Sequence, residues 1–256
     1  MHSIKEQATT TVFSQRRSNL YWILSALFVT NALLAEILGS KIFSLEATLG
    51  LSPAQLPMGF GYVLDFNLTA GVIIWPVVFI GTDLINEYFG SKGVWRVSWL
   101  TCLLIGYAFL IISILTLLQP APFWLNLNNT DTNGQPFDIN FAYNTVLKQG
   151  LGIIVGSLTA FLVGQVLDAW VFQRLRKLTS NRFLWLRATG STLISQLIDS
   201  ILVLFIAFYL LGNWPLDQVM AVAGINYIYK LVIAIVLTPL LYPAHALIDR
   251  YLGTER

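Results

Sequence analysis

The strongest constraint on this fold comes from residues 189–211, an apolar run with Gln196 and Asp199 near its middle. A helix needs about 20 apolar residues to cross a bilayer, so this run is long enough. An aspartate at mid-membrane costs roughly 2.5–3.5 kcal/mol, but Leu, Ile, Val and Phe each return about 0.3–0.6 kcal/mol, so the helix still inserts. Gln196 and Asp199 are three residues apart and share one side of the helix with Ser195. That side must face protein, water or a ligand rather than lipid.

The rest of the chain has the composition of an integral membrane protein. Of its 256 residues, 56% are hydrophobic and only 11% are charged, and the mean hydropathy is +0.68. Soluble domains seldom reach these values. Polar residues 1–19 precede an apolar run too long for a signal peptide, so we expect an uncleaved cytoplasmic N-terminal segment.

Six apolar runs predict six transmembrane helices. They cover residues 20–38, 68–88, 97–118, 149–172, 189–211 and 220–247. A proline inside a helix removes a backbone hydrogen bond, so Trp75-Pro76 predicts a kink in the second helix. Between the first two runs lies a Gly- and Pro-rich connector at 44–66, and a polar stretch without Lys or Arg occupies 119–144.

The placement of basic residues predicts the orientation. With the N-terminus inside, 12 of the 15 Lys and Arg residues lie at cytoplasmic helix ends or in cytoplasmic segments. An excess of Lys and Arg is typical of the cytoplasmic side of a membrane protein. We therefore predict an all-α integral membrane protein: a single six-helix transmembrane domain at residues 20–253, with both termini cytoplasmic.

Two short segments resemble each other. Residues 164–169 read GQVLDA and residues 195–200 read SQLIDS. They lie on predicted helices that cross the membrane in opposite directions, an arrangement that transporters use to build a site. We interpret them as paired walls of one site.

Ionisable residues at membrane depth are functional candidates because lipid disfavours them. Here they are Glu36, Asp83, Glu87, Asp168, Asp199 and Lys230. The alternative is that Lys230 forms a structural ion pair with one carboxylate while the other acids lie near the headgroups. Together with amides and hydroxyls nearby, the acids suit a planar heterocycle with N–H donors, whose faces aromatic rings could cover.

Other chemistries find little support in the sequence. Only two histidines and one cysteine, Cys102, are present, so a metal centre or a Ser–His dyad is not expected. No phosphate-binding G-x-x-x-x-G-K-[ST] sequence occurs, so ATP coupling would need a separate subunit. The basic segment 173–187 is explained by membrane topology rather than by nucleic-acid binding. We predict no cofactor and no enzymatic activity.

Four segments carry a resemblance to a known family. They are TNALLAEILGSKIFSLE (30–46), GTDLINEYFG (81–90), SQLIDSILVLFIAF (195–208) and YKLVIAIVLTPLLYPAHALIDRYLG (229–253). They resemble the queuosine-precursor transporters of the vitamin-uptake-transporter group. The resemblance implies six membrane helices and uptake of 7-deazaguanines, such as 7-cyano-7-deazaguanine (preQ0) or preQ1, across the bacterial inner membrane.

The resemblance also implies which residues face the substrate. They are Asn31, Lys41, Thr82, Asp83, Glu87, Gln165, Asp168, Gln196, Asp199, Asn226 and Lys230. Two other functions stay open: a substrate-binding subunit of an ATP-powered vitamin transporter, and an integral-membrane enzyme acting on a lipid. Because dimers are common among homo-oligomers, we favour a homodimer.

Overall fold

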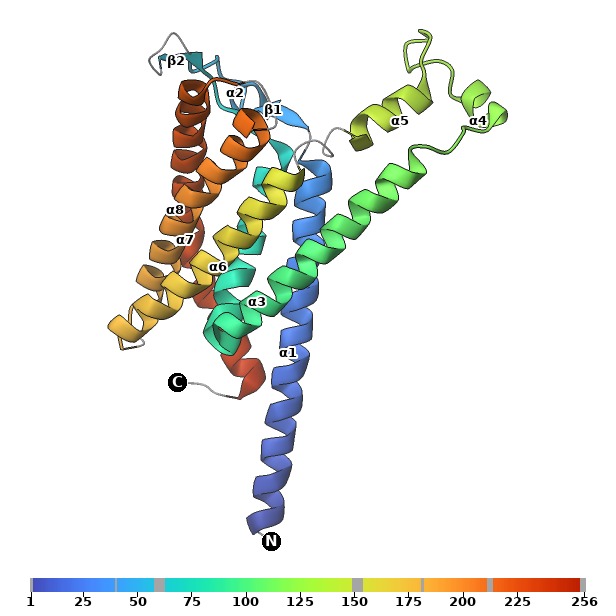
Figure 1. Ribbon diagram of the computed structural model, residues 1–256. Coiled ribbons are helices and arrows are strands. Elements are labelled where there is room, and N and C mark those ends of the chain that lie inside the picture. Colours follow the sequence, from blue (N-terminus) through green and yellow to red (C-terminus); the bar gives the residue numbers. More distant parts are fainter. Residues whose placement is uncertain are drawn as a thin grey trace.

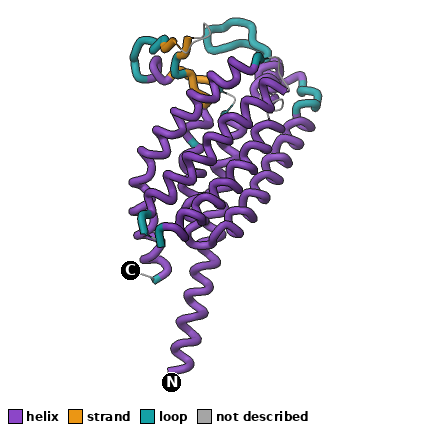
Figure 2. Tube along the Cα trace, turned by 60° about the vertical axis from the view of Figure 1, so that its left-hand side comes forward, coloured by secondary structure: helices purple, strands orange, loops and turns teal. Residues whose placement is uncertain are grey.

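The computed structural model describes residues 2–39, 41–57, 63–148, 154–180, 182–210 and 214–253. Helices packed side by side dominate it, which confirms the all-α prediction (Figures 1 and 2). They are α1 (His2–Leu38), α2 (Leu45–Thr48), α3 (Trp75–Leu115), α4 (Pro122–Leu127), α5 (Ile139–Lys148), α6 (Ile154–Leu178), α7 (Leu184–Leu204) and α8 (Leu216–Leu252). A 3-10 turn, η1 (Ala70–Ile73), precedes α3, and a π-helical turn, η2 (Phe205–Leu210), extends α7.

Three helices in the described part of the chain are long and apolar enough to cross a membrane. They are Thr11–Leu38 within α1, all of α3, and all of α8. Residues 149–153 of the predicted fourth span and Leu211 of the fifth lie outside the described residues. The count of six spans stays a prediction.

Helix α3 consists of two arms that meet at Gly90. This glycine has φ 73° and ψ −179°, a conformation that is essentially confined to glycine. The chain reverses there, so residues 75–89 and 91–115 form separate arms (Figure 1). Pro76 lies in the first turn of the helix, where its missing N–H has no intrahelical partner to lose. The predicted kink at Trp75-Pro76 is therefore wrong: the helix starts there and breaks at Gly90 instead.

The bundle has an apolar core and an apolar outer surface. Phe28 of α1, Ile85 and Ile105 of the two α3 arms and Phe172 of α6 are fully buried in one cluster. Large apolar side chains also cover the outside, among them Leu103, which is 67% exposed. A helix that is apolar all round is typical of a membrane span.

A small β-structure caps one end of the bundle (Figure 2). Strand β1 (Ile42–Ser44) pairs antiparallel with β4 (Asn67–Thr69), and β2 (Leu56–Pro57) pairs antiparallel with β3 (Val63–Leu64). The buried Glu46 carboxylate holds this connector together, because it accepts hydrogen bonds from the Phe66 amide at 2.6 Å and the Ser44 hydroxyl at 3.1 Å. The Phe66 N–H stabilises the charged form and lowers the pKa of Glu46. The Gly- and Pro-rich composition of the connector did not predict these strands.

Two further segments differ from their sequence-based description. The predicted cytoplasmic segment 1–19 is helical from His2 and continues into the first predicted span as α1, which extends beyond the bundle (Figures 1 and 2). The polar stretch 119–144 contains α4 and the first part of α5, which project away from the other helices (Figure 1).

Candidate functional site

A buried polar core lies where the first arm of α3 meets α6 and α7. The Thr82 hydroxyl donates to Gln165 Oε1 at 2.9 Å, joining α3 to α6. The Ser195 hydroxyl donates to Asp168 Oδ1 at 3.1 Å, joining α7 to α6. All four side chains are buried, so these bonds hold polar groups in an otherwise apolar interior.

Two oxygens in this core have no partner among the described residues. Asp83 and Gln196 are each 7% exposed, yet Asp83 Oδ1 and Gln196 Oε1 accept no hydrogen bond there. A buried acceptor without a donor costs about 1–3 kcal/mol, and more when it is charged. Asp83 also lines a narrow cavity of about 20 Å³ between α3, α7 and α8. These two oxygens can accept hydrogen bonds from a ligand that enters the core.

The two similar segments contact each other reciprocally. The aspartate of the first, Asp168, accepts from Ser195, the first residue of the second. The aspartate of the second, Asp199, packs against Gly164, the first residue of the first, where a side-chain Cβ would lie 3.5 Å from Asp199 Cβ. The resemblance between 164–169 and 195–200 thus corresponds to a symmetric contact of α6 with α7.

A second polar group lies farther along α7. Lys230 of α8 forms an ion pair with Asp199. Glu36 of α1 accepts from the Ser157 hydroxyl of α6 at 2.6 Å, and its carboxylate interacts electrostatically with Asp199. The sequence analysis gave an ion pair between Lys230 and one carboxylate as the structural alternative to a functional role. The structure contains such a pair, between Lys230 and Asp199.

Glu87 is held by two arginines that the sequence assigned to a cytoplasmic loop. Arg187 Nη2 lies 3.1 Å from Glu87 Oε2, and Arg176 Nη2 lies 3.6 Å from Glu87 Oε1. Arg187 is 3% exposed and its guanidinium lies over the Phe172 ring at 5.6 Å. The sequence analysis did not predict that Arg187 is buried. The feature that could have indicated it is the position of this arginine two residues before the apolar run 189–211, within the first turn of α7.

Asn86 is a further member of the core. Its amide donates to the Ala169 carbonyl at 3.2 Å and accepts from Gln173 Nε2 at 2.6 Å. The residue is fully buried, so it locks α3 to α6 beside the Thr82 contact.

Three predicted site residues are not brought into this core by any contact described. The Asn31 amide donates to Leu27 O of its own helix. Lys41 is exposed at the start of the β-structure, and Asn226 is half-buried on α8. The other eight, Thr82, Asp83, Glu87, Gln165, Asp168, Gln196, Asp199 and Lys230, lie on α3, α6, α7 and α8. No group of three or more His, Cys, Asp or Glu residues in the described part of the chain could hold a metal ion.

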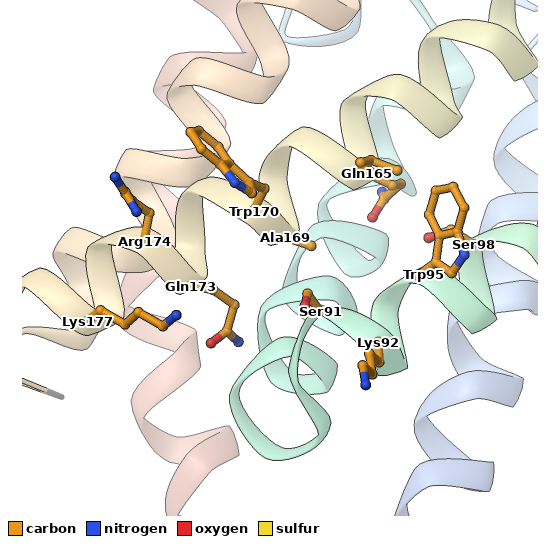
Figure 3. A pocket seen from close by; sticks show the side chains of 11 residues that line it. Ser91, Lys92, Trp95, Ser98, Gln165, Ala169, Trp170, Gln173, Arg174 and Lys177 are labelled. Carbon is orange, nitrogen blue, oxygen red and sulfur yellow. The ribbon is translucent and has the colours of Figure 1, made fainter.

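A larger cavity of about 440 Å³ lies outside the acids, between α6 and the start of the second α3 arm (Figure 3). It is lined by Ser91, Lys92, Trp95, Ser98, Gln165, Val166, Ala169, Trp170, Gln173, Arg174 and Lys177. Gln165 reaches both this cavity and the polar core.

Comparison with known proteins places the chain in a family. Residues 69–244 match the family described as "Putative vitamin uptake transporter". The chain is 30% identical over 186 residues to the "Probable queuosine precursor transporter" of Bacillus subtilis, covering 72% of this chain and 75% of the relative. It is 31% identical over 186 residues to the "Queuosine precursor transporter" of Escherichia coli, covering 71% and 73%.

A third relative agrees with these two. The "Probable queuosine precursor transporter" of Haemophilus influenzae is 26% identical over 184 residues, which cover 70% of this chain and 69% of the relative. No solved structure matches the chain. All three relatives are named as transporters, which agrees with the prediction that the chain is not an enzyme. The protein is thus a membrane protein of the vitamin uptake transporter group, and within that group it belongs to the queuosine precursor transporter family.

Proposed function

We propose that this protein takes up a queuosine precursor, a 7-deazaguanine such as preQ0 or preQ1, across the inner membrane of a bacterium. The names of its relatives in Bacillus subtilis and Escherichia coli support this class of cargo. The structural observation that supports a site is the pair of unsatisfied oxygens on Asp83 and Gln196 in the buried core.

The chemistry of a deazaguanine suits these oxygens. Its aminopyrimidinone edge presents a ring N–H next to an exocyclic amine, and a carboxylate can accept from both. Asp83 is the acceptor for this edge, and Gln196 accepts a further donor of the heterocycle. A donor that satisfies this buried carboxylate removes the cost of its unpaired oxygen, which favours binding. Thr82, Gln165 and Asp168 complete the polar lining.

Binding at Asp83 requires the helices to separate. A cavity of about 20 Å³ is far smaller than a bicyclic heterocycle, so the site is shut in this state. Alternating access by movement of one helix group against another is how transporters with inverted pairs expose such a site. The reciprocal contact of α6 and α7 supports this mode of opening.

The proposed carrier crosses the membrane six times. The spans are α1, the two arms of α3, α6, α7 with η2, and α8, and both termini are cytoplasmic. The distribution of Lys and Arg supports this orientation. Contacts of α3 with α1, α6 and α8, and of α7 with α6 and α8, support one transmembrane domain over residues 20–253. We also propose that the carrier works without an ATP-driven subunit and assembles as a homodimer.

Uptake into liposomes by the purified protein tests the proposal. Asp83→Asn keeps the shape of the side chain but offers one acceptor oxygen and adds a donor where the heterocycle also presents donors. We expect at least a tenfold loss of preQ0 or preQ1 uptake relative to the unmodified protein at equal reconstituted amounts.

The matched control is Asp217→Asn, an exposed aspartate in the first turn of α8, outside the core. It should transport normally. Uptake at the unmodified rate by the Asp83→Asn protein would overturn the assignment of the site. Absence of uptake by the unmodified protein alone would instead favour the ATP-powered alternative.

A further inference from the structure

We propose that the 440 Å³ cavity between α6 and the second arm of α3 binds the phosphate headgroup of an anionic phospholipid, whose acyl chains run along the adjacent apolar faces of both helices. The site is separate from the buried acids. The proposal does not depend on which substrate the protein carries.

Three cations line the cavity. They are Lys92 at the start of the second α3 arm and Arg174 and Lys177 on α6, and all three are exposed. None takes part in an ion pair found among the described residues, and no Asp or Glu is in the cavity lining. Arg176, between two of them in sequence, bonds Glu87 instead. The positive charge at the cavity is therefore available to an anion.

A hydroxyl in the wall of the cavity adds a second, independent feature. Ser98 is fully buried, and its Oγ has no hydrogen-bond partner in the described part of the chain. Ser98 lines the same cavity, and Ser91, which is exposed, adds a second hydroxyl to the lining. Hydroxyls and cations together are the donors that hold phosphate oxygens.

The apolar surroundings favour a lipid over a free phosphate. Trp95, 47% exposed, and Trp170, 60% exposed, lie on the two helices beside the charged residues (Figure 3). Tryptophan is typical of the level where headgroups meet acyl chains. Trp99 and Leu103 continue the exposed apolar face along α3 at helical spacing, and Val166 does so on α6. A basic pocket next to such a track suits an anionic lipid.

Lipid binding is tested by fluorescence and by thermal unfolding of the purified protein in detergent. We expect phosphatidylglycerol with brominated acyl chains to quench tryptophan fluorescence at concentrations at least fivefold lower than brominated phosphatidylcholine does. Replacing Trp95, Trp99 and Trp170 by Phe should remove most of this quenching. Phosphatidylglycerol should also raise Tm, whereas inorganic phosphate should not.

The charge contribution is tested with two matched double variants. Arg174→Gln with Lys177→Gln removes two cavity cations, and Arg96→Gln with Arg182→Gln removes two exposed cations from nearby segments outside the cavity. Only the first pair should abolish the preference for phosphatidylglycerol. Equal losses in both pairs would show diffuse attraction and overturn the site. An equal rise in Tm with inorganic phosphate would overturn the lipid assignment.

Discussion

Asp199 is accompanied by a cation, as Glu87 is, but its partner is a single lysine rather than two arginines. Lys230 reaches it from α8, with side chains 23% and 16% exposed for Lys230 and Asp199. Breaking such a pair leaves one charge in apolar surroundings, which is more costly than removing both. The pair can therefore serve folding, substrate binding or both, and stability and transport must be measured separately.

Neutralising one partner of this pair should destabilise the protein. We expect Asp199→Asn to lower the free energy of unfolding by about 1–3 kcal/mol, because Lys230 then loses its carboxylate. Adding Lys230→Gln should recover most of the loss. Thermal unfolding in detergent measures both effects. If Asp199 also binds substrate, the double variant will be stable yet inactive in liposome uptake. A stable double variant with full uptake would restrict the pair to a structural role.

Residue-scale prediction from sequence worked where burial alone decides the outcome. Asp83, Gln165, Asp168 and Gln196 were predicted to avoid lipid, and all four are buried in contact with protein. Arg187 was missed because it lies close to a charged loop in sequence. Only the packing of α7 against Glu87 brings its guanidinium into the interior. Asn31 was included because the family resemblance implies it, although its amide bonds its own helix.

At the scale of elements, Gly90 decides the course of the longest helix. Its φ of 73° with ψ near 180° lets the chain turn between two arms without strain. The sequence predicted two separate spans here, at residues 68–88 and 97–118. Their limits were less accurate, since Leu68 belongs to β4 and the first arm starts at Trp75. Leu68 belongs to a strand because β4 pairs with β1, and a hydropathy pattern does not reveal strand pairing of this kind.

Alanine at this turn should destabilise the protein through the backbone alone. A Cβ at Gly90 would meet no atom within 4 Å, so crowding plays no part. We expect Gly90→Ala to lower the free energy of unfolding by about 1–3 kcal/mol. Gly106→Ala is the control: its Cβ would also meet no atom within 4 Å, but the residue is helical. In the Gly106→Ala control, the higher helix propensity of alanine should raise the free energy of unfolding by up to about 1 kcal/mol. Similar values for both variants would contradict the role of the turn.

At the scale of the molecule, the relation between α6 and α7 ties sequence to architecture. The similarity of 164–169 to 195–200 predicted paired walls, and the two segments do contact each other through Asp168 and Ser195. The sequence could not reveal that the aspartate of each segment contacts the first residue of the other segment. That relation depends on the axial register of α6 and α7, which the amino-acid sequence does not fix.

Topology can be tested with single cysteines, because Cys102 is the only native one. In a Cys102→Ala background, Thr132→Cys lies between α4 and α5 and Ser180→Cys lies between α6 and α7, both at exposed positions. We expect a membrane-impermeant maleimide to label residue 132 in intact cells and residue 180 only after lysis. Labelling of both positions in intact cells would contradict the six-span arrangement.

The narrow cavity at Asp83 also bears on how water reaches the buried acids. A space of about 20 Å³ has room for about one water molecule, so it holds no continuous file of water past Asp83 in this state. The Thr189–Thr238 hydrogen bond at 2.7 Å closes the same junction between α7 and α8. The junction of α7 and α8 beside Asp83 is therefore a dry seal in this state, and water can form a continuous path along it only after these helices part.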